Sequence, residues 1–294
     1  MKILITGSSG MVGKELKKVL ARHDIIEFDH HLKLDILNEE QLKKKMAGVN
    51  CVIHLAGIID TTNPNLWEVN VNGTKKVLQS AINAKVKKFI FMSSTGVYGT
   101  NNKLIDEKTP IHPENEYEKS KAEGEKIVFE EREKIGVNVI RSAIVLGTND
   151  YWKKMFKMLQ KKYPLPLNGE NHFQVIYSKE LACAIKLVME KGITGEIYLA
   201  AGNEKKTLNE FCNLVQSELG LEKKLVHIPS ILGIVFGKLF GIKLLTIDNI
   251  RHLGKERNYN TKKIHSIGYK QKYSLKEALN EIVKEFNKTN AKKE

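Results

Sequence analysis

A glycine-rich turn near the start of the chain restricts its fold more than any other feature of the sequence. Residues 2–6 are a short aliphatic run typical of a buried strand, and residues 14–22 carry apolar side chains at helical spacing. Between them the chain reads Gly7-Ser8-Ser9-Gly10-Met11-Val12-Gly13. Glycines permit a tight turn there, and backbone N–H groups at a helix start can bind a pyrophosphate. In this context the turn predicts a dinucleotide site made by Gly7, Ser9, Gly10, Met11, Val12 and Gly13.

Strands and helices alternate as far as about residue 148. Apolar runs predict strands at 25–28, 51–55, 89–92 and 137–145, and a strand or turn at 32–36. Helical spacing predicts helices at 38–46, 65–84 and 117–134. Parallel strands need crossover connections, so the alternation predicts an α/β fold with a doubly wound parallel sheet of the Rossmann type.

The pattern changes in the second half of the chain. A helix at 178–191 and a strand at 197–200 fit the same sheet, and an amphipathic helix is predicted at 274–287. We therefore expect residues 1–148 and about 179–206 to form the dinucleotide-binding domain. About 149–178 and 207–294 would form a smaller, interleaved C-terminal substrate lobe.

Composition and charge exclude several classes of protein. With 41% hydrophobic and 28% charged residues, the chain has ordinary globular composition. The formal net charge of +14 suggests nucleic-acid binding, but the lysines are spread along the whole chain, which indicates a solvated surface. We therefore expect no nucleic-acid partner. A positive field would still help to collect an anionic cofactor and an anionic substrate.

Cysteine usage and hydropathy favour a cytoplasmic protein. Cys51, Cys183 and Cys212 lie far apart and form no CxxC pair, as expected of free thiols in a reducing compartment. The chain opens without an export signal, and no metal-binding set is apparent. The longest apolar stretch, 228–237, is shorter than the roughly 20 residues that span a bilayer. It predicts a buried or pocket-covering helix and no membrane partner, with contact at a membrane surface as the alternative.

Asp29 is the residue that bears on the choice of cofactor. It ends the second predicted strand, where a carboxylate accepts hydrogen bonds from an adenosine ribose and repels a 2′-phosphate. This favours NAD. His30, His31 and Lys33 follow closely and could accommodate a phosphate, so NADP stays possible.

A tyrosine and a lysine form the candidate catalytic pair. Tyr117 and Lys121 are spaced i, i+4, so both lie on one face of a predicted helix. A free tyrosine has a pKa of about 10, and a nearby ammonium lowers it towards neutrality. The hydroxyls of Ser93, Ser94 and Thr95 follow a buried strand, where the carboxyl ends of parallel strands face a ligand crevice. One of them can bond a substrate oxygen that changes between alcohol and carbonyl.

Several motifs occur in a fixed order along the chain. They are Gly7 to Gly13, His54-Leu55-Ala56-Gly57, Asn70-Val71-Asn72-Gly73-Thr74, Ser93-Ser94-Thr95-Gly96-Val97-Tyr98-Gly99 and Tyr117-Glu118-Lys119-Ser120-Lys121. Together with the C-terminal segment 259–277 they resemble the extended short-chain dehydrogenase/reductases, the NAD-dependent epimerase/dehydratase family. The resemblance covers nearly the whole chain.

The resemblance implies a role for each matching residue. Tyr117 would be the acid/base, Lys121 would hold the nicotinamide ribose and tune Tyr117, and Ser94 would bind the reacting oxygen. The remaining cofactor contacts would come from Asp35 and Ile36 at the adenine, Leu55, Ala56 and Gly57 beside the pyrophosphate, and Asn70. His54 is expected to be a packed strand-end residue. The family commonly dimerises through two helices per subunit, so a homodimer through 65–84 and 117–134 is expected, with Leu66, Val77, Ile127 and Val128 serving either that interface or the sheet.

Departures from the family pattern narrow the reaction. Sugar dehydratases carry an Asp-Glu pair where this chain has Thr95 and Gly96, which disfavours dehydration. Ile144 stands where nucleotide-sugar epimerases often place an asparagine near a diphosphate, which weakens the case for a nucleotide sugar without excluding it.

Three activities stay open at this point. The leading prediction is an NAD-dependent 4-epimerase of a nucleotide sugar or related hydroxy compound, an anionic small molecule, acting through a transient ketone. The first alternative is an NAD(P)H-dependent reductase or dehydrogenase, similar to the dTDP-dehydrorhamnose reductases or to the hydroxysteroid and dihydroflavonol enzymes. The second is a non-catalytic cofactor-binding sensor, which the intact Ser94, Tyr117 and Lys121 argue against.

Overall fold

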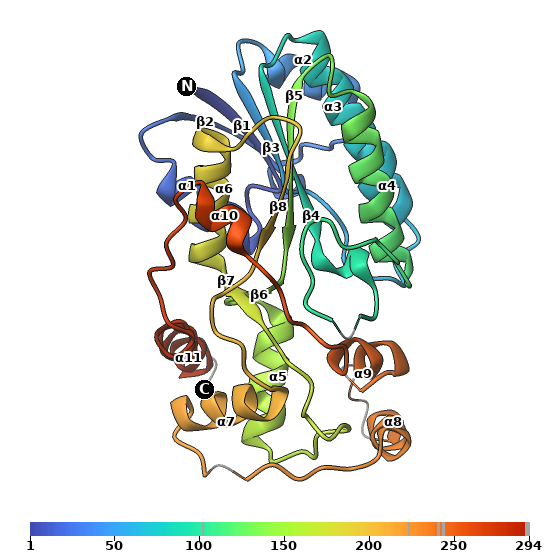
Figure 1. The fold of residues 1–294 in the computed structure, drawn as a ribbon, viewed down its shortest axis with the longest axis vertical. Helices are drawn as coiled ribbons and strands as arrows, with labels where there is room; N and C mark the ends of the chain where they lie inside the picture. The colour runs from blue at the N-terminus through green and yellow to red at the C-terminus, as the bar shows by residue number, and fades with distance from the viewer. Residues whose placement is uncertain (102, 223, 240–241, 243–244, 292–294) are drawn as a thin grey trace.

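A parallel sheet of six strands lies at the centre of the computed structural model, which describes residues 1–101, 103–222, 224–239, 242 and 245–291 (Figure 1). The strand order is β2-β1-β3-β4-β5-β8. The strands are β1 (Lys2–Thr6), β2 (Asp24–Phe28), β3 (Cys51–His54), β4 (Lys88–Ser94), β5 (Gly136–Ser142) and β8 (Ile197–Ala200). Every pairing is parallel, so the predicted doubly wound sheet is confirmed.

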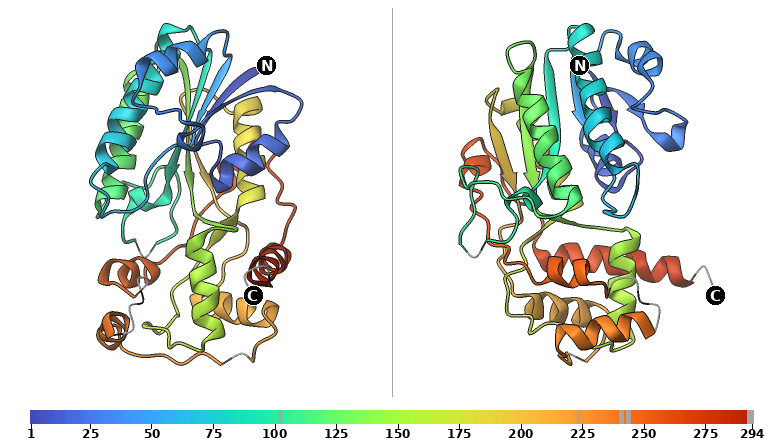
Figure 2. Two further views of the ribbon diagram at one scale, coloured as in Figure 1. Left: turned by 180° about the vertical axis from the view of Figure 1, so that it is seen from behind. Right: turned by 90° about the vertical axis from the view of Figure 1, so that its right-hand side faces the viewer.

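Helices cover both faces of this sheet (Figures 1 and 2). One face carries α1 (Met11–Val19), α6 (Ser178–Lys191) and α10 (Lys262–Ser266), and the other carries α2 (Glu39–Met46), α3 (Thr74–Asn83) and α4 (Glu116–Glu130). Strands covered on both faces need continuous apolar runs. β1 and β3 meet that condition, since Ile3, Leu4 and Ile5 are fully buried and every residue of β3 is buried.

The second lobe lies beyond the carboxyl ends of the strands (Figure 1). It contains the two-stranded sheet of β6 (Ile144–Leu146) and β7 (Val175–Tyr177) and the helices α5 (Asp150–Gln160), α7 (Leu208–Glu218) and α11 (Leu275–Ala291). These helices share a separate apolar cluster that includes Trp152, Phe156, Phe211 and Phe286. The helices α8 (Ser230–Leu239) and α9 (Ile247–Leu253) lie on the opposite side of the lobe from α11 (Figure 1).

Two of the predicted elements take a particular form in the structure. Of the strand or turn predicted at 32–36, the turn is found, since the chain makes a short 3-10 turn, η1 (His30–Leu32), and Lys33 then adopts a left-handed φ of 58°. The helix predicted at 65–84 is confirmed, with residues 66–83 helical and a π-helical turn, η2 (Glu68–Gly73), leading into α3. Buried Asn70 lies in that turn, and its side chain bonds the neighbouring loop.

The tail of the chain returns to the first domain. Tyr259, Ile264 and Tyr269 are buried in the apolar cluster that contains α1, α6 and β8, although the sequence places 207–294 in the substrate lobe. From Leu275 onward, the buried residues of the chain pack in the apolar cluster of the second lobe. The chain therefore passes between the first domain and the second lobe more often than the sequence predicts.

The residues predicted to serve either a dimer interface or the sheet are mostly buried within the subunit. Val77 and Val128 are fully buried in the cluster with Phe89 and Phe91, and partly buried Ile127 packs against the same cluster. Leu66 is buried as well. A homodimer through α3 and α4 stays a prediction, and it would have to use other side chains of these helices.

Candidate active site

The glycine loop joins β1 to α1 and is packed too closely for other residues. Gly7 has a φ of 70°, and its N–H donates to the Phe28 carbonyl at 2.9 Å. A Cβ at Gly7 would lie 2.8 Å from the Ala56 backbone nitrogen, and one at Gly13 would lie 2.5 Å from the Gly7 carbonyl oxygen. Glycine is therefore required at both positions, for the close approach of β2, β3 and α1.

The start of α1 can accept an anion. Gly10 is the N-cap residue, and neither a side-chain cap nor an acidic residue of the first turn is present among the described residues there. The first backbone N–H groups of a helix have no intrahelical partner, and the helix dipole favours negative charge at this end. The residues present therefore fit the pyrophosphate of a dinucleotide.

Asp29 lies beside this loop, as predicted. Its carboxylate is almost fully buried and accepts the Ser9 N–H and the His31 N–H, each at 2.9 Å. The side chain therefore fastens the glycine loop to the turn after β2. A carboxylate has about four lone-pair sites, so it can accept further hydrogen bonds from a ribose.

The other predicted adenine contacts lie further along the same turn. One Asp35 carboxylate oxygen accepts the Leu37 N–H at 2.9 Å, which shapes an exposed turn. Ile36 is buried and packs against α3, where a Cβ at Gly73 would come within 2.5 Å of its Cδ1 atom. Both residues follow Asp29 along the chain after β2.

Asn70 holds the turn that follows β3. Its side-chain oxygen accepts the Ile58 N–H at 2.7 Å, and its amide donates to the Ile58 carbonyl at 2.8 Å and to Ser120 Oγ at 3.0 Å. A Cβ at Gly57 would lie 3.1 Å from Asn70 Oδ1 and 3.4 Å from Lys121 Nζ. Asn70 thus ties the turn after β3, which includes Leu55 and Ala56, to α4 and brings it next to Lys121.

His54 has a structural position, as expected. Its ring is fully buried, with hydrogen bonds to Thr6 Oγ1 at 2.6 Å and Thr74 Oγ1 at 2.9 Å, and it stacks on Phe91. Burial, and then the positive charge of Lys121, lowers its pKa from 6.5 to about 3. A neutral imidazole of this kind joins β1, β3 and α3.

The three hydroxyls at the end of β4 have three different partners. Ser93 donates to the buried carboxylate of Glu125, and Thr95 bonds Tyr259. Ser94 bonds Tyr117. The Ser94 Oγ atom also accepts the Gly96 N–H at 3.0 Å, at the start of the 3-10 turn η3 (Thr95–Tyr98). Of the three, Ser94 is the hydroxyl that the fold brings to the predicted catalytic tyrosine.

The pKa of Tyr117 shifts in the direction opposite to the one expected for a tyrosine beside Lys121. Burial raises the Tyr117 pKa to about 12, the bond from Ser94 lowers it in part, and the charge of Glu118 raises it. Burial also lowers the Lys121 pKa to about 8, and its ammonium donates to the Met92 carbonyl at 2.9 Å. The expected lowering of the Tyr117 pKa by Lys121 is not seen in the protein alone. Tyr117 is therefore a neutral phenol that can donate to a substrate oxygen.

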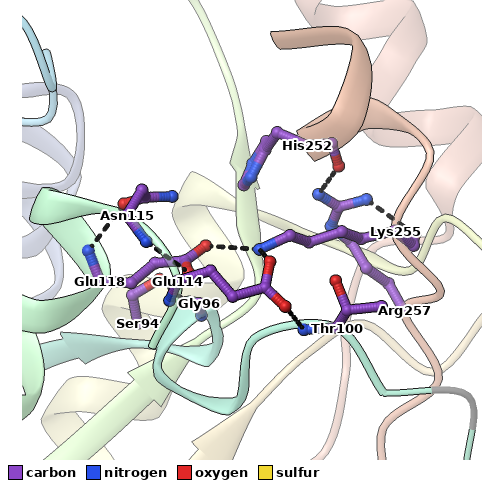
Figure 3. Close-up of polar contacts among 9 residues, drawn as sticks. All are labelled: Ser94, Gly96, Thr100, Glu114, Asn115, Glu118, His252, Lys255 and Arg257. Carbon is purple, nitrogen blue, oxygen red and sulfur yellow. Dashed lines mark hydrogen bonds and ion pairs between the residues drawn. The ribbon is translucent and has the colours of Figure 1, made fainter. Parts of the chain in front are cut away.

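An ion-pair cluster beside Tyr117 was missed in the sequence. Lys255, just after α9, reaches across to α4 and pairs with Glu118 at 2.8 Å and with Glu114 at 3.0 Å (Figure 3). Glu118 is almost fully buried and also forms a capping box with Asn115. The spacing of Asn115 and Glu118 in the sequence indicates a capping box. No neighbouring residue indicates the contact with Lys255, which lies 137 residues from Glu118.

A cavity of about 510 Å³ lies next to this cluster. Its polar lining comes from Thr100, Glu114, Ser230, Arg251 and Lys255, and its apolar lining from Leu167, Ile234, Ile247 and Ile250. The cavity therefore combines Arg251 and the Lys255–Glu114 ion pair with an apolar wall, and Lys255 connects it to Glu118, the residue that follows Tyr117.

Comparison with known proteins assigns the family. The sequence model of the NAD dependent epimerase/dehydratase family matches residues 3–201, which include all the predicted cofactor and catalytic residues. The chain belongs to this family. It is therefore an enzyme of the extended short-chain dehydrogenase/reductase type, as the motifs predict, and its glycine loop fits the nicotinamide dinucleotide for which the family is named.

Relatives of this family match over the full length. One is the N-acetyl-α-D-glucosaminyl-diphospho-ditrans,octacis-undecaprenol 4-epimerase of Escherichia coli O157:H7, 26% identical, with 99% of this chain and 97% of the relative covered. Among solved structures, UDP-glucose 4-epimerase from Thermotoga maritima has a TM-score of 0.82 at 24% identity, covering 99% and 100% of the two chains. A dTDP-glucose 4,6-dehydratase from Streptomyces venezuelae, with NAD and TYD bound, has a TM-score of 0.81 at 19% identity and covers 99% and 98%.

The buried imidazole of His54 predicts a pH dependence of stability. The unfolded chain binds a proton on this ring below about pH 6.5, whereas the folded protein does so only near pH 3. The stability that neutral His54 contributes is thus complete above pH 6.5 and is lost as the pH falls towards 3. The loss can reach about 1.4 kcal/mol per pH unit.

Urea unfolding of the wild type and of His54→Gln at several pH values measures this effect. The variant is expected to be less stable throughout and to show a shallower slope between about pH 4 and 6. Burial lowers the pKa of His252 to about 3 as well, so part of the slope should remain. Identical slopes in the two proteins would show that His54 is not the buried neutral group described here.

Proposed function

We propose that this chain is an NAD-dependent 4-epimerase of a hexose carried on a diphosphate, acting through a transient keto sugar. The observation that carries the proposal is the placement of Ser94 near enough to Tyr117 to lower its pKa, at the carboxyl edge of the sheet, with Lys121 beside Gly57. The family membership and the 4-epimerase relatives support the reaction type.

Each member of the Ser94, Tyr117 and Lys121 set has a separate task. With NAD bound, the positive charge of Lys121 would favour the Tyr117 phenolate, which would take the proton of the 4-hydroxyl as that group becomes a carbonyl; the phenol would give it back when the alcohol forms again. Ser94 Oγ would donate a hydrogen bond to the same oxygen. Lys121 would also hold the nicotinamide ribose. The nicotinamide ring of NAD would supply reversible hydride transfer.

The residues that line the cavity support a diphosphate-linked substrate. Arg251 supplies positive charge for the diphosphate, whereas the charge of Lys255 is balanced by Glu114 and Glu118, and Glu118 connects this region to Tyr117. No asparagine occupies the Ile144 position, so Arg251 would take its place. The apolar wall of Leu167, Ile234, Ile247 and Ile250 favours an apolar carrier, as in the diphospho-undecaprenol relative, over a nucleotide base.

A product assay tests the proposed reaction. Protein denatured directly after purification should release near-stoichiometric NAD, because an epimerase needs no cofactor exchange. Incubation with N-acetylglucosamine linked to UDP, and in parallel to a polyprenyl diphosphate, should yield the 4-epimer with no net change in NADH absorbance. Net oxidation of NADH or NADPH over carbonyl substrates would instead identify the reductase.

Replacement of Tyr117 by phenylalanine separates chemistry from cofactor binding. Tyr117→Phe should lower kcat at least about 100-fold, because the acid/base is lost, while the Kd for NAD stays within about twofold. Tyr273→Phe serves as the matched control, since that ring packs against Tyr177 in the second lobe. Full activity of Tyr117→Phe would refute the catalytic assignment.

Asp29 should determine the preference for NAD. Removal of its charge in Asp29→Asn takes away the repulsion of a 2′-phosphate and weakens the ribose contacts. The ratio of the NADP and NAD dissociation constants should therefore shift by about tenfold in favour of NADP, equivalent to about 1.4 kcal/mol. Asp24→Asn, at the exposed opposite end of β2, is the charge-matched control. An unchanged ratio would show that Asp29 only holds the loop.

A further inference from the structure

The helix α8 presents an apolar face to the outside of the molecule. Ile231, Leu232, Val235 and Leu239 lie on one side of it and are 73%, 54%, 48% and 76% exposed. The sequence predicts a buried or pocket-covering helix here. The pocket-covering part holds, since Ser230 and Ile234 line the cavity, but these four side chains are not buried. A cluster of large exposed aliphatic side chains on one helix face marks an interaction surface.

The opposite face of α8 fixes this orientation. A Cβ at Gly233 would lie 2.2 Å from Pro166 Cβ, and one at Gly237 would lie 2.5 Å from Leu245 Cβ. The Phe236 ring also packs on Tyr163, with 5.6 Å between centroids. Only the glycine face can approach the lobe so closely. The aliphatic side chains are therefore held outward by the packing of the helix.

Exposed basic residues lie on α8 and in segments near it. The side chains of Lys224, Lys238 and Arg251 are exposed. Exposed Lys161 and Lys162 come from the segment that packs on α8 through Tyr163. Aliphatic side chains beside lysines are the composition of helices that lie at an anionic membrane surface.

The length of α8 decides between lying on a bilayer and crossing it. Its 10 residues extend about 15 Å, half the thickness of the hydrocarbon core. Among the described ranges of the chain, no helix is long and apolar enough to span a membrane. The helix can therefore lie only in the plane of the interface.

We propose that α8 docks this protein on the surface of an anionic phospholipid bilayer. Its aliphatic face enters the headgroup region, and the neighbouring lysines lie beside lipid phosphates. The cavity lies directly behind this surface, because Ser230 and Ile234 of α8 and half-exposed Ile247 of α9 line it. The consequence for catalysis rests on the proposed function: a lipid-linked sugar diphosphate would reach the cavity from the membrane without leaving the interface.

Vesicle co-sedimentation of the full-length protein tests the docking. The wild type should sediment with vesicles of phosphatidylcholine and phosphatidylglycerol at low salt, at least about tenfold more tightly than with pure phosphatidylcholine, and raised salt should release it. Ile231→Asp should weaken the binding at least about tenfold because it places a charge in the apolar face. Lys238→Glu should weaken it only on the anionic vesicles.

Ile193→Asp is the matched control. Ile193 is 65% exposed and lies at the amino ends of β5 and β8, the edge of the sheet opposite the second lobe. This variant should bind as the wild type does, and thermal unfolding should show that all three variants are folded. Vesicle binding requires no turnover. A protein that fails to bind vesicles would therefore not contradict the epimerase proposal. An enzyme without activity would not contradict the docking proposal.

Three results would overturn the proposal. The wild type could fail to bind anionic vesicles, or Ile231→Asp could bind as tightly as Ile193→Asp does. Light scattering without vesicles could also show that Ile231→Asp dissociates an oligomer of the wild type. In that last case the apolar face would be an interface between copies of this chain.

Discussion

A buried ion pair between α4 and β5 holds the elements that carry the predicted catalytic residues. The Glu125 carboxylate accepts hydrogen bonds from Arg141 at 2.6 Å (Nη2) and 3.0 Å (Nε), and both side chains are 5% exposed. Ser93 donates to the same carboxylate, and Arg141 donates to the Tyr98 hydroxyl at 2.9 Å. Burial lowers the Arg141 pKa, but its bonds to Glu125 and Tyr98 and the charge of Glu125 outweigh burial and raise the pKa above its ordinary value. Removal of one partner of such a pair leaves an uncompensated buried charge, which costs about 3–5 kcal/mol.

The placement of the site depends on this ion pair. α4 carries Tyr117 and Lys121, and β4 carries Ser94, so the docking of α4 on the sheet sets the distances between them. Gly124 allows the close approach, since a Cβ there would lie 2.6 Å from the Phe91 ring. With Ser93 occupied by Glu125 and Thr95 by Tyr259, Ser94 is left for the tyrosine. The network therefore selects one hydroxyl out of three chemically similar ones.

In the proposed function, the first domain carries the reaction and the second lobe binds the substrate. The strands supply a rigid edge where the glycine loop, Asn70 and the Tyr117 pair meet. The second lobe supplies the cavity, the cations Arg251 and Lys255, and the outward face of α8. Lys255 links the two, because its ion pair with Glu118 joins the region after α9 to the residue beside Tyr117. Changes in the second lobe can thus alter the substrate while the chemistry is kept.

The sequence alone determined the elements that depend on neighbours along the chain. Strand β8 and helix α6 appear with the predicted bounds, and the glycine loop lies between β1 and α1, because hydrophobic periodicity and turn residues act over a few positions. The identity and order of the motifs also fixed the family. Within the predicted site, Asp29 lies beside the glycine loop, and Asn70 and Lys121 lie beside Gly57, while their roles stay predictions.

Only the tertiary structure decided the contacts between distant segments. The pairing of Lys255 with Glu118, the return of Tyr259 to the first domain and the π-helical turn at Asn70 have no local signal. The direction of the Tyr117 pKa shift and the outward face of α8 depend on burial, which many distant residues create together. Burial and long-range packing are properties of the folded chain, so a pattern of neighbouring residues cannot specify them.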